Sequence, residues 1–417
     1  MKRSAWAGQS ESILLDNVAI VTGPDMELVP RGFIKIESGR ILVVGEGSGG
    51  SAKHEMDCEG LIAIPGFVDA HTHVGDSIAK DAGVGLPIAE VVSPIRGLKH
   101  EILRSTSDAE LVAAMREALS DMIRSGVTTF ADFREGGISG AKLLLEAAQG
   151  LAIRTVILAR LSAVPFTIDE LAKNSAALPD RAVEEVREVL QITHGISSSS
   201  ANDLTDPAMQ QISDLARKSG KLRAIHVAEA KESIEKSKRR TGMTDVERVV
   251  KYFDPDFVVH MTNASSEDID LVARNRIPVV SCPRANSILG VGFPPLVRMT
   301  RAGLRLALGT DNVMLNAPDM FREIDYVARM VRAMERDPSA PKPADVLKMA
   351  TINGAKALGM DGEIGSIEGG KAADILLVDA RDLNLRYSRD PVSSLVLRAG
   401  VQNVRAVFVG GRLAYER

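Results

Sequence analysis

Short apolar runs separated by turn residues mark both ends of the chain. Between Ser12 and about Ile64 these runs are bounded by glycines and polar residues, and the same texture returns between Asp374 and Val409. Runs of this length and spacing are typical of β-strands joined by turns. We therefore expect residues 1–63 and 361–417 to pair into one small β-sandwich module.

Residues 64–360 instead alternate short apolar runs with longer stretches of helical periodicity. This alternation is the pattern of parallel β/α units. Eight strand-like runs occur in order along the chain, which is the number that a (β/α)8 (TIM) barrel requires. The runs cover residues 61–68, 127–133, 154–158, 190–196, 222–227, 257–260, 278–281 and 304–308.

Composition agrees with this α/β architecture. The chain of 417 residues fits a barrel of about 250 residues plus a smaller module. With 45% hydrophobic and 25% charged residues, it is expected to be a soluble globular protein. A net charge of -4 and 4% aromatic residues provide neither a basic stripe nor base-stacking platforms, so we expect no nucleic-acid partner.

The sequence also bears on location and assembly. Lys2 and Arg3 are followed by no apolar stretch of the length a signal peptide needs, and no run is long enough to span a membrane. Cys58 and Cys282 lie far apart, which argues against a disulfide framework and suits a reducing compartment. We expect a cytoplasmic protein with no membrane partner, and a homodimer is the commonest soluble assembly.

Two histidines follow directly on an apolar strand in the segment PGFVDAHTH, residues 65–73. In an extended chain, His71 and His73 share a face, so both imidazoles can reach one metal ion. The carboxyl end of a barrel strand is where such barrels carry their active sites. On its own, however, a His-x-His pair is about as often structural as metal-binding.

Three more polar residues end other predicted strands and strengthen the metal hypothesis. His226, His260 and Asp311 each follow an apolar run, and the carboxyl ends of barrel strands meet at one mouth. Imidazoles and a carboxylate suit one divalent metal, with zinc as the first choice and iron or manganese as alternatives. We expect His71, His73, His226 and Asp311 to be the ligands, with a position left for water.

Glu229 and His260 are the candidates for moving or placing protons near the metal. Glu229 lies three residues after His226, where the strand has ended and the chain can turn its carboxylate back toward the site. A carboxylate beside a metal that is not itself a ligand can act as a proton shuttle; the alternative is a solvated loop residue. His260 is either a further ligand or a neighbour that holds the metal's water or polarises the substrate, and we favour the second role.

These segments together resemble the amidohydrolase superfamily over nearly the whole chain. The His-x-x-Glu spacing is similar to that of the mononuclear branch, which contains cytosine, guanine, adenosyl and triazine deaminases and chlorohydrolases. The loop after the first predicted strand resembles poorly characterised chlorohydrolase-like proteins of archaea. The resemblance is carried by PGFVDAHTH at 65–73, HVAE at 226–229, His260, LGTDN at 308–312, MATINGAKALG at 349–359 and GSIEGGKAAD at 365–374.

The resemblance implies one metal and a hydrolytic deamination. Binuclear relatives carry a carboxylated lysine at the end of the fourth strand, and residues 192–201 contain no lysine. The resemblance further implies that the metal lowers the pKa of its bound water and that Asp311 accepts the proton. His260 would orient the resulting hydroxide, and Glu229 would protonate a ring nitrogen and then the leaving group. The expected substrate is an N-heterocycle such as a purine, pyrimidine, pterin or nucleoside-like compound.

Residues that could contact this small-molecule substrate lie in three segments at the predicted mouth. The segment SCPRAN, residues 281–286, is similar to the Cys-Pro-x-x-Asn element of guanine and adenosyl deaminases. Polar loop residues are often merely solvated. Arg134, at the end of the second predicted strand, could instead form a structural ion pair. The candidates are Asp76, Ser77, Lys80, Arg134, Arg284 and Asn286.

Two other functions remain open at this stage. The same metal site could hydrolyse an amide, a cyclic amide or a C–Cl bond, and release of ammonia from a panel of heterocycles would separate these activities from deamination. A more distant alternative is a metal-binding protein without catalysis, which the combination of metal ligands and Glu229 disfavours.

Overall fold

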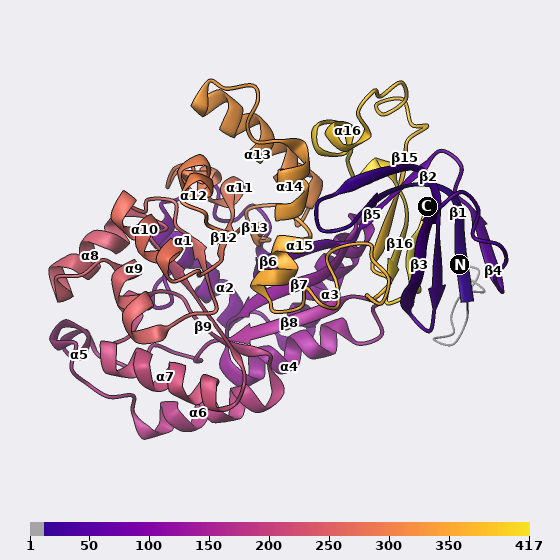
Figure 1. Ribbon diagram of the computed structural model, residues 1–417. Coiled ribbons are helices and arrows are strands. Elements are labelled where there is room, and N and C mark those ends of the chain that lie inside the picture. The colour runs from indigo at the N-terminus through magenta and orange to yellow at the C-terminus, as the bar shows by residue number, and fades with distance from the viewer. Residues whose placement is uncertain (1–11) are drawn as a thin grey trace.

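The structure is a computed structural model that describes residues 12–417 (Figure 1). It consists of a mixed β-sheet, where the two labelled ends of the chain lie, and a barrel surrounded by helices. The first eleven residues of the predicted module, Lys2 and Arg3 among them, lie outside the described residues.

The mixed sheet joins the two ends of the chain, as predicted. Its strand order is β17-β16-β15-β5-β1-β2-β3, with β4 paired to β1. The antiparallel pair β5 and β15 connects the two ends, with Leu61 opposite Asp379 and Pro65 opposite Ile375. The strands are β1 (Ser12–Thr22), β2 (Glu27–Glu37), β3 (Arg40–Glu46), β4 (His54–Asp57), β5 (Leu61–Pro65), β15 (Ile375–Asp379), β16 (Val404–Val409) and β17 (Arg412–Glu416).

This sheet has a hydrophobic core of its own, built by alternation along its strands. On β2, Ile34 and Ile36 are buried while Phe33 and Lys35 are only partly so, because successive side chains of a strand point to opposite faces. Ile34 and Ile36 pack in one cluster with apolar residues of the carboxyl-terminal strands, such as Phe408. The module is therefore held together by side chains from both ends of the chain.

The second sheet is parallel and closes on its first strand to form the barrel. β13 pairs with β12, and β14 pairs with β6, so these two segments act as halves of one strand that closes the barrel. Thr310 lies between the halves, and its N and Oγ1 donate hydrogen bonds of 2.9 Å and 2.6 Å to the Asp69 carboxylate on β6. The strands are β6 (Phe67–His73), β7 (Val127–Arg134), β8 (Arg154–Ala159), β9 (Gly195–Ser198), β10 (Leu222–Val227), β11 (Phe257–His260), β12 (Val279–Ser281), β13 (Leu306–Leu308) and β14 (Asp311–Asn312).

Two of the eight predicted strands were placed wrongly. The apolar run at 61–68 contains the end of β5 and the start of β6, because Pro65 and Gly66 interrupt it between two different sheets. The run at 190–196 starts inside helix α6, which continues to Ile192, while the strand begins only at Gly195. The other six runs overlap observed barrel strands.

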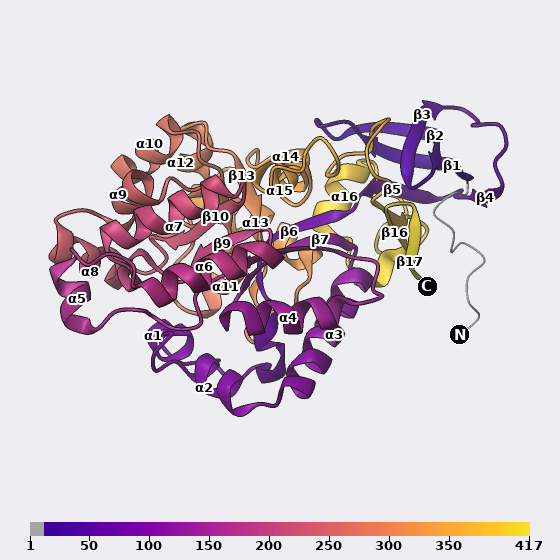
Figure 2. The same cartoon turned by 90° about the horizontal axis from the view of Figure 1, so that it is seen from below.

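Helices cover the outside of the barrel (Figures 1 and 2). α3 shows why they form: Ser107 and Glu110 make a reciprocal capping box at its start, and Leu111, Met115 and Leu119 bury one face. The helices are α1 (Ile88–Val92), α2 (Leu98–Ser105), α3 (Asp108–Arg124), α4 (Gly137–Ala148), α5 (Ile168–Lys173), α6 (Asp180–Ile192), α7 (Asp206–Lys218), α8 (Lys231–Thr241), α9 (Asp245–Arg248), α10 (Ser266–Arg274), α11 (Pro283–Ile288), α12 (Leu296–Arg301), α13 (Met320–Glu335), α14 (Pro343–Met349), α15 (Ile352–Ala357) and α16 (Pro391–Leu397). Short turns η1 (Val74–Ala79), η2 (Ala201–Asp203), η3 (Val249–Phe253) and η4 (Val401–Asn403) complete the list.

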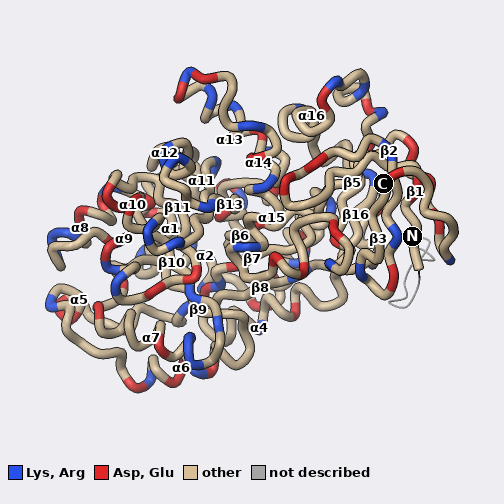
Figure 3. Tube along the Cα trace, viewed as in Figure 1, with Lys and Arg blue, Asp and Glu red and all other residues tan. Residues whose placement is uncertain are grey.

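The barrel interior is apolar, with the polar groups at the ends of its strands. Val68, Ala131, Leu158, Ala224 and Val259, from five strands, belong to one buried cluster inside the barrel. Lys and Arg are interspersed with Asp and Glu along the whole trace (Figure 3). Within residues 12–417, no helix has both the length and the apolar character that a membrane span requires.

Candidate active site

A bulge in β6 turns the side chains of His71 and His73 toward the barrel interior. Val68 and Ala70 belong to the interior cluster, so strict alternation would turn His71 away from it. Between Asp69 and Thr72 the register shifts, and β6 has one residue more than β7, which re-aims the side chains that follow. The two imidazole rings then lie 4.9 Å apart, centroid to centroid.

His226, His260 and Asp311 converge on this pair from β10, β11 and β14. The ring centroid of His71 lies 4.9 Å from that of His226 and 5.7 Å from that of His260. Asp311 Oδ1 is 3.3 Å from His71 Nε2 and 3.6 Å from His73 Nε2. Potential ligand atoms of His71, His73 and His226, and also those of His71, His260 and Asp311, lie within 4.8 Å of one another. The sequence-predicted residues are thus brought together in two groups of three that share His71, each of which could hold a metal ion.

The protonation of these histidines suits metal binding. Burial lowers the pKa of His71 and of His226 to about 3 and lowers the pKa of His73 well below its usual value. At pH 7 the rings are therefore neutral, which is the form that binds a metal. His73 Nδ1 lies 3.0 Å from the carbonyl oxygen of Phe133, and His226 Nδ1 lies 2.9 Å from that of Ser198. A carbonyl only accepts, so Nδ1 carries the hydrogen and Nε2 keeps a free lone pair.

Several buried polar atoms in this group have no hydrogen-bond partner among the described residues. They are both ring nitrogens of His71 and Oδ2 of Asp311. Buried polar groups are normally satisfied, and each exception calls for an explanation such as a bound ion. A divalent cation between His71 and Asp311 would satisfy one ring nitrogen of His71 and the Asp311 carboxylate, so the residues present fit a metal.

Two of the convergent residues have a strained backbone. His260 has φ 77° and Asp311 has φ 65°, a left-handed region that costs non-glycine residues roughly 1–3 kcal/mol and persists only where the surroundings enforce it. Gly309 permits the close approach of β13 to β6, because a Cβ there would lie 2.7 Å from His71 Cβ. The strain fixes where the Asp311 carboxylate points.

His260 is held by Asn286, which selects its tautomer. Thr262 Oγ1 donates a 2.9 Å hydrogen bond to Asn286 Oδ1, which leaves the Asn286 amide hydrogens facing His260 Nδ1 at 3.1 Å. Nδ1 then accepts, and burial keeps the ring neutral by lowering its pKa to about 3. The ring hydrogen therefore sits on Nε2, which makes that atom a donor rather than a metal ligand.

Glu229 lies beside this donor. Its Oε1 is 3.6 Å from His260 Nε2. Burial and the negative charge of Asp311 raise the pKa of Glu229 to about 8. A carboxylic acid with a pKa near neutrality can both give and take a proton, which is the property a general acid–base needs.

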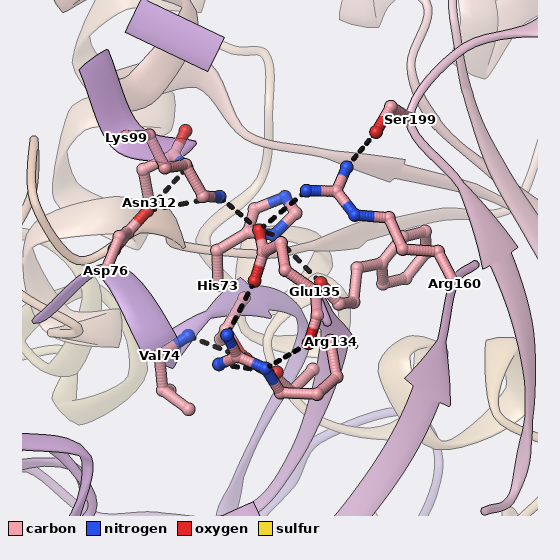
Figure 4. Close-up of polar contacts among 12 residues, drawn as sticks. His73, Val74, Asp76, Lys99, Arg134, Glu135, Arg160, Ser199 and Asn312 are labelled. Carbon is pink, nitrogen blue, oxygen red and sulfur yellow. Dashed lines mark hydrogen bonds and ion pairs between the residues drawn. The ribbon is translucent and has the colours of Figure 1, made fainter. Parts of the chain in front are cut away.

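A layer of buried ion pairs lies behind His73 (Figure 4). Glu135 Oε1 is 2.9 Å from His73 Nδ1, 2.5 Å from Lys99 Nζ and 3.1 Å from Arg160 Nη2, while Oε2 is 2.9 Å from Arg134 Nη2. Burial alone would raise the pKa of Glu135, but the three cations outweigh it and hold that pKa well below its usual value. Glu135 is therefore a permanent anion that anchors both His73 and the cations around it.

Two cavities adjoin the candidate metal site. A small one of about 340 Å³ is lined by the convergent histidines together with Lys99, Arg160 and Glu229. A larger one, of about 1140 Å³, is lined mainly by apolar side chains of α3, α4 and the loop after β8. Arg160 and Ser199 line both cavities, so they form the wall between them.

The six predicted substrate contacts have different surroundings. Asp76 is buried, accepts a 2.8 Å hydrogen bond from Asn312 Nδ2, and lies 3.3 Å from Lys99 Nζ. Ser77 is buried and Lys80 is exposed. Their direct contact with a substrate stays a prediction.

The remaining three predicted contacts are engaged with neighbouring side chains. Arg134 pairs with Glu135, as the alternative of a structural ion pair anticipated. Arg284 Nη1 lies 3.6 Å from the carboxyl group of Glu323, and Arg284 does not line the small cavity. Asn286 contacts His260.

Sequence reasoning missed Lys99 and Arg160. Arg160 directly follows β8, so the rule that polar residues at strand ends meet at the mouth could have found it. Lys99 lies in the first turn of α2, in a loop region whose path the sequence does not reveal.

The chain is similar to known proteins over most of its length. Residues 62–414 match the amidohydrolase family. The chain belongs to the amidohydrolase family. It is 37% identical over 402 residues, 96% of this chain and 98% of the relative, to a protein of Methanothermobacter thermautotrophicus that is provisionally named an aminohydrolase. It is 30% identical to a 5-methylthioadenosine/S-adenosylhomocysteine deaminase of Moorella thermoacetica, covering 97% and 94% of the two chains.

A solved structure agrees in fold. An adenosine deaminase of Xanthomonas campestris with bound zinc superposes with a TM-score of 0.84 at 23% identity, over 96% of this amidohydrolase and 92% of that chain. At this level of identity the likeness shows the fold, which is of the TIM-barrel type. The chain is accordingly a hydrolase of C–N bonds by family.

Proposed function

We propose that this amidohydrolase deaminates an N-heterocycle with the help of one divalent metal, held by His71, His73, His226 and Asp311. The observation that carries the proposal is the convergence of neutral imidazoles and a carboxylate whose buried atoms lack partners in the described part of the chain. Zinc is the metal that best suits three imidazoles and one carboxylate, with iron and manganese as alternatives. The zinc in the Xanthomonas campestris adenosine deaminase supports the same choice.

A single metal is proposed because the fourth barrel strand supplies no bridging group. β9 ends at Ser198, and its carbonyl oxygen orients His226. A lysine, which could be carboxylated to bridge two metals, is absent from residues 192–201.

The chain's own residues would divide the chemistry as follows. A bound divalent metal supplies a water molecule whose pKa lies near neutrality. Asp311 would take up one proton of the water, and His260 would donate its Nε2 hydrogen to orient the attacking oxygen. Glu229, with a pKa of about 8, would give its proton to the ring nitrogen. The proton held by Asp311 would then pass to the amine, which leaves as ammonia, and Glu229 would regain a proton from the hydroxyl of the adduct as the carbonyl forms.

Deamination is favoured over the alternatives by the acidic group. An amine or ammonia must be protonated to leave, and Glu229 is protonated at neutral pH and 3.6 Å from His260. Chloride needs no proton to leave, so a chlorohydrolase would use only the first role of this acid, protonation of the ring nitrogen. Hydrolysis of an amide or cyclic amide on the same site is the second candidate, because it also requires a protonated leaving nitrogen.

The test is ammonia release from a panel of purines, pyrimidines, pterins and nucleosides by the zinc-loaded protein, with a chlorinated heterocycle and a cyclic amide alongside for the alternatives. The 5-methylthioadenosine/S-adenosylhomocysteine deaminases among the relatives make adenosine derivatives the first members of the panel. Glu229→Gln should keep its zinc and lose about 10²–10⁴-fold in kcat. Near-normal turnover by Glu229→Gln would remove Glu229 from the mechanism, and release of chloride or of a ring-opened acid without ammonia would replace deamination by the alternatives.

The proposal extends to the architecture around the site. We assign residues 1–63 with 361–417 to a β-sandwich module and residues 64–360 to the catalytic barrel. The shared hydrophobic core of the mixed sheet supports the first assignment. A homodimer in the cytoplasm stays a prediction.

A further inference from the structure

We propose that the substrate carries an anionic oxygen group, a carboxylate or a phosphate, that Lys99 and Arg160 bind in the metal cavity. This inference rests on the proposed function, because it describes the substrate of the same site. It concerns the one part of the cavity wall that neither metal binding nor proton transfer employs.

The two cations are built into the site rather than attached to its surface. The Lys99 side chain is 2% exposed and that of Arg160 is 10% exposed, and both line the cavity that His73, His226 and His260 also line. They come from different segments, α2 and the end of β8. Burying two cations next to a metal site is costly unless acidic partners compensate.

Their compensation within the protein rests on shared carboxylates. Asp203 and Asp132 also attract Arg160, but among the described residues neither lies within ion-pair distance of it. Lys99 Nζ and Arg160 Nη2 both lie against one atom, Glu135 Oε1, at 2.5 Å and 3.1 Å (Figure 4). The same carboxylate also serves Arg134 and His73. Asp76, 3.3 Å from Lys99, is the other carboxylate in contact with the pair among the described residues. One shared anion holds two like charges close together, and a second anion in the cavity would relieve their repulsion.

Lys99, Arg160 and Ser199 keep N–H and O–H groups that can still donate hydrogen bonds into the cavity. An ammonium has three N–H groups and a guanidinium has five, more than the partners that surround each of them here. Arg160 Nη1 donates to Ser199 Oγ, so the hydroxyl hydrogen of Ser199, which also lines the cavity, is free to donate. A cluster of charged donors matches a carboxylate or a phosphate better than a neutral ring edge.

Binding of matched pairs of compounds tests the inference. The protein carries Glu229→Gln so that turnover does not interfere, is loaded with zinc, and is titrated by calorimetry with cytosine and cytosine-5-carboxylate, and with adenosine and adenosine 5′-monophosphate. The first pair tests a carboxylate and the second a phosphate. We expect the charged member of at least one pair to bind at least about tenfold more tightly than its neutral partner.

Substitutions in the cation pair locate the effect. Arg160→Gln and Lys99→Met should each reduce the preference by about tenfold while zinc content stays unchanged, and Arg160→Lys should retain part of it. The matched controls are Arg187→Gln and Lys142→Met, at exposed positions of helices α6 and α4, which should leave the preference unchanged. Circular dichroism checks folding, and the comparison of Arg160→Gln with Arg160→Lys decides the matter if Lys99→Met does not fold.

The inference is overturned if neither pair shows a preference, if no member binds, or if the preference survives both Arg160→Gln and Lys99→Met. These outcomes are distinct from failure of the proposed function. Ammonia release without any preference for anions would leave deamination standing and remove the inference. A strong preference for the charged probes without ammonia release from any heterocycle would do the reverse.

Discussion

Replacing Glu135 by glutamine should destabilise the protein strongly, because it removes the shared anion of a buried cluster. Lys99, Arg134 and Arg160 lie 2.5 Å, 2.9 Å and 3.1 Å from its oxygens. At about 3 Å and an effective dielectric constant of about 20, one such pair is worth roughly 5 kcal/mol before desolvation is subtracted. Removing one partner of a buried pair costs about 3–5 kcal/mol net, since the cations stay buried.

The assay is urea unfolding followed by far-ultraviolet circular dichroism, on metal-free and zinc-loaded protein. Measuring both forms separates loss of the ion pairs from loss of zinc through a displaced His73. Glu184→Gln is the matched control, because its pair with Arg187 spans 3.2 Å but both side chains are more than half exposed. Such an exposed pair contributes less than about 1 kcal/mol.

The salt dependence of the two substitutions provides a second test. Salt should weaken the effect of Glu184→Gln but hardly change that of Glu135→Gln, since buried charges are screened much less than exposed ones. A shift in the unfolding midpoint of Glu135→Gln no larger than that of the control would refute the view that this anion holds the cluster together.

Three further predictions address the metal, the proton relay and a buried acid. Elemental analysis should give about one zinc per chain in the parent and none in the His71→Ala, His73→Ala double variant; full retention, or two metals in the parent, would contradict the site. Asn286→Ala should lower kcat at least about tenfold with zinc retained, because the His260 tautomer is no longer fixed; an unchanged kcat would argue against that role. Glu323 is buried and its pKa is raised to about 8 by burial, so it keeps its proton in the fold but loses it in the unfolded chain. Protonated Glu323 thus contributes fully to the free energy of unfolding below pH 4.5. That contribution declines as the pH rises and is lost by about pH 8. The slope of the decline is on the order of 1 kcal/mol per pH unit. Glu323→Gln should flatten that decline in urea midpoints, and an equally steep decline would contradict the assignment.

Much of the site was predictable because strand ends are visible in a sequence. An apolar run followed by a polar residue shows where a buried strand reaches the mouth of the barrel, and this placed His71, His73, His226, His260 and Asp311 together before any coordinates. Closure of the barrel by eight parallel strands follows from the same runs. The sequence also predicted that both ends of the chain share one sheet.

The errors in the strand positions have a local cause. Short apolar runs do not distinguish a buried strand from the buried face of a helix. The run that ends α6 at Ile192 was therefore assigned to the following strand, which starts at Gly195. The run around Pro65 was likewise taken as one strand, although it is divided between two sheets.

The sequence by itself determined the fold class and which side chains could hold a metal, because both depend on periodicity and on residue type. Only the tertiary structure decided which charged residues face that metal. Arg284 and Arg160 each follow a barrel strand closely, yet Arg284 lies beside Glu323 away from the small cavity and Arg160 lines it beside Lys99. The difference lies in the path of the chain after the strand and in the partner available to each charge, and these are properties of packing between distant segments.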